Sequence, residues 1–201
     1  MYTPAHFKNS NLADVKDFIK QNSFGILICQ VEKSIVATHI PLELSIDEKK
    51  LTGHVSRANP QWRNFSSSNE VLSIFSGPHA YISSSWYNHE NVPTWNYIAV
   101  HVYGTIEIIE GDVLVDSLKK MVDKYEKNSS TPVSLDKMSA AYVERALQGI
   151  VGFEINITRI EAAYKLSQNR DEANHLNIIR VLEKKSDAGS LEIAKEMRKR
   201  R

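Results

Sequence analysis

The 201-residue chain has little of several features that mark common protein classes. Its single cysteine, Cys29, cannot form an intramolecular disulfide, and the apolar run around it predicts a buried structural thiol. No apolar run approaches the roughly 20 residues that a membrane-spanning helix needs. The first residues lack the basic and apolar segments of a secretory signal. We therefore expect a cytoplasmic protein that does not enter a membrane.

Glycine and metal-ligand patterns are also sparse. The eight glycines are scattered and form neither the Gly-x-Gly-x-x-Gly turn of dinucleotide-binding folds nor the Gly-x-x-x-x-Gly-Lys-Ser/Thr phosphate loop. The seven histidines show no ligand spacing, and neither His-Glu-x-x-His nor paired cysteines occur. The sequence thus predicts no Rossmann nucleotide site and no metal site.

The chain also has no large excess of either charge, because the net charge is only +1. No overall field therefore favours nucleic acid or a membrane as the partner. The local exception is the C-terminal run Arg198 to Arg201, four consecutive cations. Two readings stay open: a solvated helix end whose cations suit the helix dipole, or a weak contact to DNA phosphates.

The chain does have the alternation of apolar and polar residues that is typical of strands. The clearest case is the run from Thr94 to Ile109. One face would carry Ile98, Val100, Val102, Ile106 and Ile108, and the other Trp95, Tyr97, His101, Tyr103 and Glu107. The first face fits a core. The second, aromatic and polar, needs another subunit or a planar ligand to cover it.

Further strands are predicted at residues 24–31, 34–44, 51–56, 71–76, 80–86 and 150–160. Helices are predicted after Asn11, after Asn59-Pro60, around 114–125, at 139–147, and twice near the C-terminus with a break at 187–189. Short connections between successive strands favour antiparallel pairing. We therefore predict an α+β, mainly β, fold: an antiparallel barrel of six to seven strands with flanking helices.

Three polar clusters interrupt this pattern. The first is Thr38-His39-Ile40. The second joins His54, Ser56, Arg57 and Asn59 where a strand ends and a helix begins, so that a hydroxyl, a guanidinium and free N–H groups suit a phosphate. An ordinary helix cap with a surface arginine is the alternative. The third runs from Lys165 to Arg170 and holds two cations and two amides.

In this order the motifs resemble the PaiB-type family of FMN-binding transcriptional regulators, known as protease synthase and sporulation negative regulators. The resemblance covers about residues 1–170, with 171–201 as a C-terminal helical extension. The motifs are Met1-Tyr2-x-Pro4, His39-Ile40-Pro41-Leu42, the run Gly53 to Pro60, the run Ser76 to Ser83, Val92-Pro93-Thr94-Trp95-Asn96-Tyr97, and the run Lys165 to Arg170. The segment 84–91 is shorter than in that family and lacks its proline and lysine.

The resemblance implies an FMN-binding split barrel of the flavin-reductase-like superfamily, assembled as a homodimer with FMN at the subunit interface. It implies cofactor contacts from Thr38, His39, Ile40, His54, Ser56, Arg57, Asn59, Trp95, Asn96, Tyr97, Lys165, Gln168 and Arg170. The family's role would make the protein a negative transcriptional regulator. DNA could then be contacted through the basic C-terminal tail.

Two other functions stay open. A flavin-dependent oxidoreductase, either an NAD(P)H:flavin reductase or a small-substrate oxidase, would let the flavin carry the electrons. In that case His39 and His54 are the first candidates for proton transfer, although the sequence assigns no catalytic residue. A haem-linked split-barrel protein is the third reading.

Overall fold

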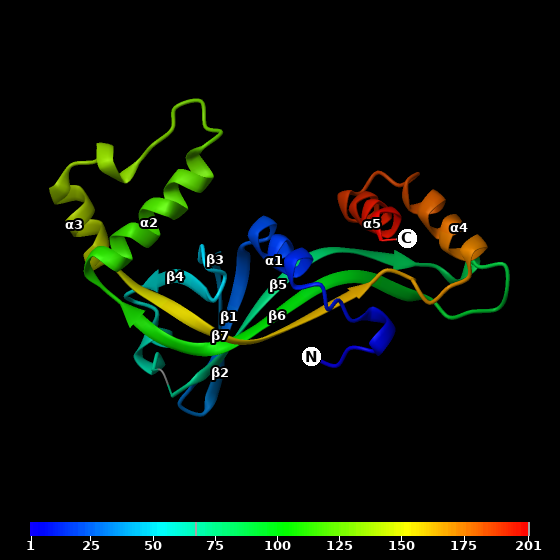
Figure 1. Ribbon diagram of the computed structural model, residues 1–201, viewed down its shortest axis with the longest axis horizontal. Helices are drawn as coiled ribbons and strands as arrows, with labels where there is room; N and C mark the ends of the chain where they lie inside the picture. The colour runs from blue at the N-terminus through cyan, green and yellow to red at the C-terminus, as the bar shows by residue number, and fades with distance from the viewer. Residues whose placement is uncertain (67, 201) are drawn as a thin grey trace. The chain divides into compact units, whose positions relative to one another are not determined.

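The computed structural model describes residues 1–66 and 68–200. Seven strands form a sheet in the order β2-β1-β5-β6-β7-β4-β3 (Figure 1). The strands are β1 (Phe24–Val31), β2 (Ser34–Pro41), β3 (Glu43–Leu44), β4 (Lys50–Ser56), β5 (Glu70–Ile82), β6 (Thr94–Ile109) and β7 (Ile150–Lys165). β1 pairs antiparallel with β2 and β5, and β4 pairs antiparallel with β3 and β7.

Five α-helices accompany the strands in the described residues: α1 (Leu12–Gln21), α2 (Gly111–Glu126), α3 (Ala140–Gln148), α4 (Glu172–Leu182) and α5 (Ala188–Lys199). Short 3-10 helices η1 (Ala5–Phe7), η2 (Pro60–Asn64), η3 (Ser84–Trp86) and η4 (Leu135–Lys137) complete the element order. Contacts divide the chain into two compact units. The first holds residues 1–18, 75–101 and 161–201, and the second holds 19–74 and 102–160. The division at residue 170 stays a prediction.

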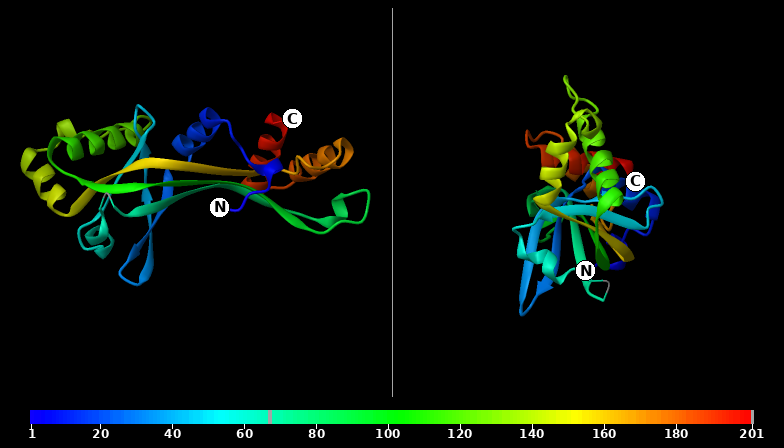
Figure 2. Two further views of the ribbon diagram at one scale, coloured as in Figure 1. Left: turned by 60° about the horizontal axis from the view of Figure 1, so that its bottom comes forward. Right: turned by 90° about the vertical axis from the view of Figure 1, so that its left-hand side faces the viewer.

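The second unit contains the β1–β2 hairpin, the β3–β4 hairpin, the start of β5 and parts of β6 and β7. In this unit β1 pairs with β5, and β4 pairs with β7. Its core is formed by large apolar side chains such as Leu27, Leu51 and Phe153, which are fully buried. The Phe65 and Phe153 rings meet edge to face with centroids 5.1 Å apart. α2 and α3 are successive in the chain, joined by a long loop, as the views of Figures 1 and 2 show.

The first unit contains the remaining halves of β5, β6 and β7 with α4 and α5. These two helices pack together and bury Ile178, Ile179, Leu182, Ile193 and Met197. Asp171 and Asp187 cap their N-termini by accepting hydrogen bonds from the backbone N–H groups of Asn174 and Ser190. α5 lies against β5, because a Cβ on Gly189 would come within 2.6 Å of the His79 carbonyl oxygen.

Several boundaries differ from the sequence prediction. β5 is one strand through Gly77-Pro78, where two strands were expected. Its pairing with β1 involves residues 72–74 only, so the missing N–H of Pro78 costs no hydrogen bond to that neighbour. Residues 84–86 form a 3-10 turn in place of the end of a strand, and β7 extends to Lys165.

The strand predicted at 34–44 is divided at Leu42 into β2, which pairs with β1, and β3, which pairs with β4. Leu42 is buried, and its N–H donates to the Ser23 carbonyl. On β6 the predicted alternation holds up to Ile106. It then shifts, so that Ile108 is 39% exposed and Ile109 is buried. The placement of Ile108 on the core face was therefore wrong.

Candidate functional site

A small polar cavity of about 190 Å³ lies in the first unit. It brings together three residues that the sequence predicted as cofactor ligands: Asn96 of β6, Lys165 at the end of β7, and Arg170 in the turn that follows. The other lining residues are Phe7, Val92, Thr94, Ser167 and Asn169. Thr94, Ser167 and Asn169 were not among the predicted ligands, although all three lie inside the motifs that carried the resemblance.

The cavity is electropositive because none of the described residues that line it is acidic. Partial burial lowers the pKa of Lys165, and the charge of Arg170 lowers it further. The Lys165 Nζ donates to Thr94 Oγ1 and lies 5.7 Å from the centre of the Phe7 ring, while the Arg170 guanidinium lies 5.1 Å from the Tyr87 ring. Lys165 and Arg170 repel each other, and no carboxylate lines the cavity to offset their charges. A bound anion would therefore stabilise both cations.

The turn after β7 is held by buried hydrogen bonds. Ser167 has a positive φ of 59°, an uncommon conformation for a residue with a Cβ. It donates to Asn96 Oδ1 at 3.1 Å and accepts from Asn96 Nδ2 at 3.0 Å. The Gln168 amide accepts from the Leu166 N–H at 2.7 Å and donates to the Tyr164 carbonyl. Gln168 therefore shapes the turn and is not among the residues that line the cavity.

Trp95 and Tyr97 point to the opposite face of β6 from Asn96, as alternation requires. The Trp95 side chain is 52% exposed, and its ring lies 5.9 Å from His79 and 5.8 Å from Tyr81. Tyr81 is itself 42% exposed. Along β6 the predicted aromatic-polar residues Trp95, Tyr97, His101, Tyr103 and Glu107 are all exposed or half-buried, which confirms the expected face of the strand. His79 and Tyr81 of β5 form an aromatic surface together with Trp95.

In the second unit Thr38 and Asn59 belong to a polar network centred on Gln61, which is fully buried. Thr38 Oγ1 donates to Gln61 Oε1 at 2.6 Å and accepts from Asn59 Nδ2 at 3.0 Å. Gln61 Nε2 donates to the Leu27 carbonyl at 3.2 Å. Asn59 caps η2 by accepting from the Gln61 N–H. Gln61 was not predicted from the sequence as a member of a polar network. The one available indication was its position just after the Asn59-Pro60 cap.

Ser56 is the last residue of β4 and Arg57 follows it, and both are exposed. The Arg57 guanidinium donates to the carbonyls of Gln148 and Ile150, both at 2.8 Å, across the C-terminus of α3. The Ser56 hydroxyl accepts a long bond from the Ala58 N–H. Two of the five N–H groups of Arg57 thus bond to carbonyls at the end of α3 and the start of β7, and the other three remain for an anion. The role of Arg57 in binding phosphate stays a prediction.

The two histidines of this group differ in environment. His39 is exposed on β2 beside buried Ile40. His54 lines an apolar cavity of about 310 Å³ beneath α2 and α3, and burial lowers its pKa. Its Nδ1 is buried without a hydrogen-bond partner among the residues that the structure describes. A histidine in that setting is neutral at pH 7.

Within the described residues, no cluster of three or more His, Cys, Asp or Glu side chains has the arrangement of a metal site. Over the same part of the chain, no helix combines the length and apolar composition needed to cross a bilayer. Cys29 is buried, and burial raises its thiol pKa, as expected for a structural cysteine.

Solved structures with the same fold include a FAD and heme binding protein from Mycobacterium smegmatis, with a TM-score of 0.65 and 13% identity, covering 85% of this chain and 78% of that one. A flavocytochrome from Azotobacter vinelandii has a TM-score of 0.60 and 15% identity, covering 85% and 75%. At identities this low, the structural similarity shows the fold alone. It confirms the predicted antiparallel split-barrel class.

Sequence comparison is more specific. A family model described as "Putative FMN-binding domain" matches residues 1–159. The chain is 46% identical over 199 residues to "Protease synthase and sporulation protein PAI 2" of Bacillus subtilis, covering 98% of this chain and 96% of that protein. These matches confirm the resemblance that the motifs indicated: the chain belongs to the PaiB family of FMN-binding-domain split-barrel proteins.

Proposed function

We propose that the protein is a homodimer that binds FMN at its subunit interface and acts as a PaiB-like negative regulator of transcription. The observation that carries the flavin part is the cavity around Lys165 and Arg170, with two cations and no acidic lining residue. The match of residues 1–159 to an FMN-binding domain supports the FMN phosphate as the ligand of this anion site.

The residues present fit a phosphate better than a whole flavin. A volume of about 190 Å³ accommodates a phosphate and part of the ribityl chain. Lys165, Arg170 and the Asn169 amide would hold the phosphate oxygens through charge-assisted hydrogen bonds. When bound, FMN supplies a ring system that can take up one or two electrons. The buried Asn96–Ser167 pair would keep the binding turn in place.

The exposed aromatic surface of His79, Tyr81 and Trp95 supports the homodimer. Val92, at the rim of the cavity, is 70% exposed. Aromatic side chains are enriched where protein surfaces meet, since they bury large areas at a small entropic cost.

Regulation through direct DNA binding has narrower support. Arg198 forms a two-pronged pair with Glu183 at 2.6 and 2.9 Å, and Arg200 pairs with Asp14 and Glu196. Lys199 approaches Asp14 only at 3.9 Å and is 63% exposed. Arg201 lies outside the described residues. The tail would therefore contact DNA mainly through Lys195 and Lys199, with an affinity that depends strongly on salt.

The decisive experiment is the absorption spectrum of the protein as purified, with the released cofactor identified. Flavin bands and FMN in the released fraction are expected. A Soret band would establish the haem-linked alternative, and a colourless protein that takes up no added FMN would refute the proposal. Anaerobic NAD(P)H then separates the two flavin functions: the regulator keeps an oxidised flavin, whereas a reductase bleaches it.

A further inference from the structure

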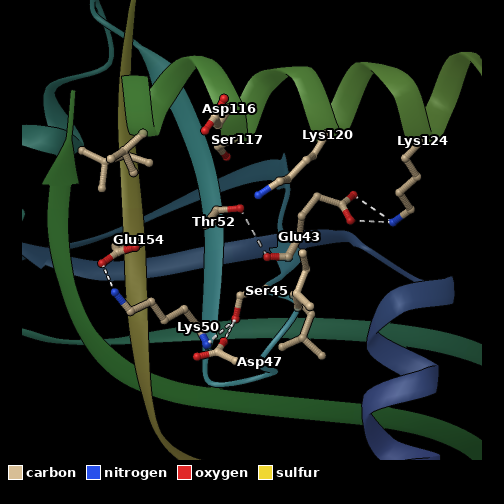
Figure 3. Close-up of a pocket in the computed structure, with 14 residues that line it drawn as sticks. Glu43, Ser45, Asp47, Lys50, Thr52, Asp116, Ser117, Lys120, Lys124 and Glu154 are labelled. Carbon is tan, nitrogen blue, oxygen red and sulfur yellow. Dashed lines mark hydrogen bonds and ion pairs between the residues drawn. The ribbon is translucent and has the colours of Figure 1, made fainter. Parts of the chain in front are cut away.

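A wide cleft of about 720 Å³ lies in the second unit, between α2 and the β3–β4 hairpin (Figure 3). β4 and β7 form one wall through Lys50, Thr52 and Glu154, and α2 forms the other through Ser117, Lys120 and neighbours. None of the predicted flavin ligands lines it. The cleft is thus a separate feature from the site proposed above.

Most charged groups in the cleft are already paired within the chain. The Lys124 Nζ donates to both carboxylate oxygens of Glu43, at 2.9 and 2.6 Å, and Lys50 pairs with Glu154. The Asp47 carboxylate accepts from the Ser45 hydroxyl at 2.6 Å, which lowers its pKa. These groups have little capacity left for a ligand.

Lys120 is different, because its ammonium group has no hydrogen bond or ion pair to any of residues 1–66 and 68–200. Figure 3 shows this side chain extending from α2 into the cleft, toward the wall that carries Thr52. Ser117 lies three residues earlier, on the same face of the helix. The Thr52 hydroxyl makes only a long bond, 3.5 Å, to the Glu43 carbonyl. An ammonium and two hydroxyls together form a donor set for an anionic head group.

The cleft also has an apolar part, and much of it is exposed to solvent. Ile46 is 89% exposed and Val113 is 58% exposed, and both line the cleft together with Leu44 and Ile109. A ligand with an apolar body would remove this surface from water, which is favourable in proportion to the area buried. A small, strongly hydrated anion would leave it uncovered.

Asp116 limits the charge that the site accepts. It lines the cleft one helical turn before Lys120 and has no ion-pair partner in the described residues. A carboxylate at this position repels a second negative charge on a ligand held by Lys120. The site therefore favours a monoanion over a phosphate dianion.

We propose that this cleft binds a small monocarboxylate with an apolar body, such as a medium-chain alkanoate. The carboxylate is held by Lys120 with Ser117 and Thr52, and the body covers Ile46 and Val113.

The test is an NMR titration of the full chain with hexanoate, hexanamide and hexyl phosphate, with shifts followed on α2 and β4. Hexanoate is expected to bind at least tenfold more tightly than hexanamide, and hexyl phosphate more weakly than hexanoate. Lys120→Gln should weaken hexanoate at least tenfold and leave hexanamide unchanged. Asp116→Asn should reduce the difference in affinity between hexyl phosphate and hexanoate.

Lys127→Gln is the matched control, because it removes an exposed lysine just beyond α2 that does not line the cleft. Its hexanoate affinity should equal that of the unmodified chain. No hexanoate-dependent shifts on α2 and β4 at millimolar concentration would overturn the proposal. An equal loss of affinity in the Lys120 and Lys127 variants would overturn it too. Adding FMN should leave the hexanoate titration unchanged, which separates this outcome from the proposed flavin function.

Discussion

The guanidinium group of Arg200 forms a two-pronged ion pair with the carboxylate of Asp14, 186 residues earlier in the chain: Nη1 to Oδ2 is 2.6 Å and Nη2 to Oδ1 is 2.9 Å. Its carbon lies 4.3 Å from the centre of the Tyr164 ring. The side chains are only 25% and 17% exposed. This contact joins the C-terminal end of α5 to α1 within the first unit.

Breaking this pair should destabilise the first unit. Asp14→Asn and Arg200→Gln are each expected to lower the free energy of unfolding by about 1–2 kcal/mol, since the charge-assisted bonds are partly screened. The Arg200 bond holds the pKa of Asp14 below its ordinary value. The contribution is therefore present above the unfolded pKa, near 3.8, and is lost as pH falls through the folded one. Urea denaturation at pH 7 and pH 3 measures both effects.

Lys195→Gln, an exposed change on the same helix, is the control. An equal loss of unfolding free energy in this variant would contradict the assignment.

Removing either cation of the anion cavity should release FMN. Lys165→Gln and Arg170→Gln are each expected to weaken FMN retention by about 1.5–3 kcal/mol, the value of one charge-assisted contact. Equilibrium dialysis against FMN and riboflavin measures the change, and riboflavin, which lacks the phosphate, should show little difference between variants. Lys185→Gln, a lysine of the same unit that lies over Trp86, is the control. If riboflavin binding falls as much as FMN binding, these two cations do not bind the FMN phosphate.

Placing a charge on the exposed aromatic surface should weaken self-association. Trp95→Asp removes a 52% exposed indole and introduces a carboxylate that would have to lose its hydration in an interface. A shift from dimer to monomer is expected by light scattering at micromolar concentration. Tyr142→Asp, on α3 in the second unit and 57% exposed, is the matched control and should stay dimeric. If Trp95→Asp remains a dimer, the interface lies on another surface.

The buried imidazole of His54 should make the protein less stable in mild acid. Burial lowers its pKa below the ordinary value near 6.5, so at pH values between the two the unfolded chain binds more protons. The free energy of unfolding should therefore fall as pH drops below about 6.5. His54→Phe should flatten this dependence between pH 7 and 5, while the exposed His39→Gln should not. Burial also lowers the pKa of His101, so part of the slope should persist in the His54 variant. An unchanged slope in His54→Phe would show that His54 does not contribute.

If the tail contacts DNA, neutralising its exposed lysines should reduce the salt dependence of binding. The double variant Lys195→Gln, Lys199→Gln leaves the Asp14–Arg200 and Glu183–Arg198 pairs in place, which truncation of the tail would not. In mobility-shift titrations, the slope of log affinity against log salt should fall by about one for each lost phosphate contact. An unchanged slope, or no complex at low salt, would exclude the tail as the DNA contact.

Much of the local structure follows from periodicity in the sequence. The predicted strands at 24–31 and 94–109 have the same bounds in the structure, because both are runs rich in β-branched and aromatic residues that end at polar segments. The cap at Asn59 is also confirmed, since its side chain and the following proline act within a few residues. Motif order alone was sufficient to identify the family.

Only the tertiary structure decided which polar residues come together. The local sequence pattern does not indicate which residues far apart in the chain share a cavity. The position of Lys165 beside Thr94, and that of Gln61 in the Thr38 network, could therefore be seen only in the folded chain. The same holds for the pairing of Arg200 with Asp14 and for the cleft around Lys120. By itself the sequence determined most of the elements, the split-barrel class and the family, because these depend on local periodicity and motif order. The positions of the charges depend on contacts between residues far apart in the chain, and folding alone establishes them.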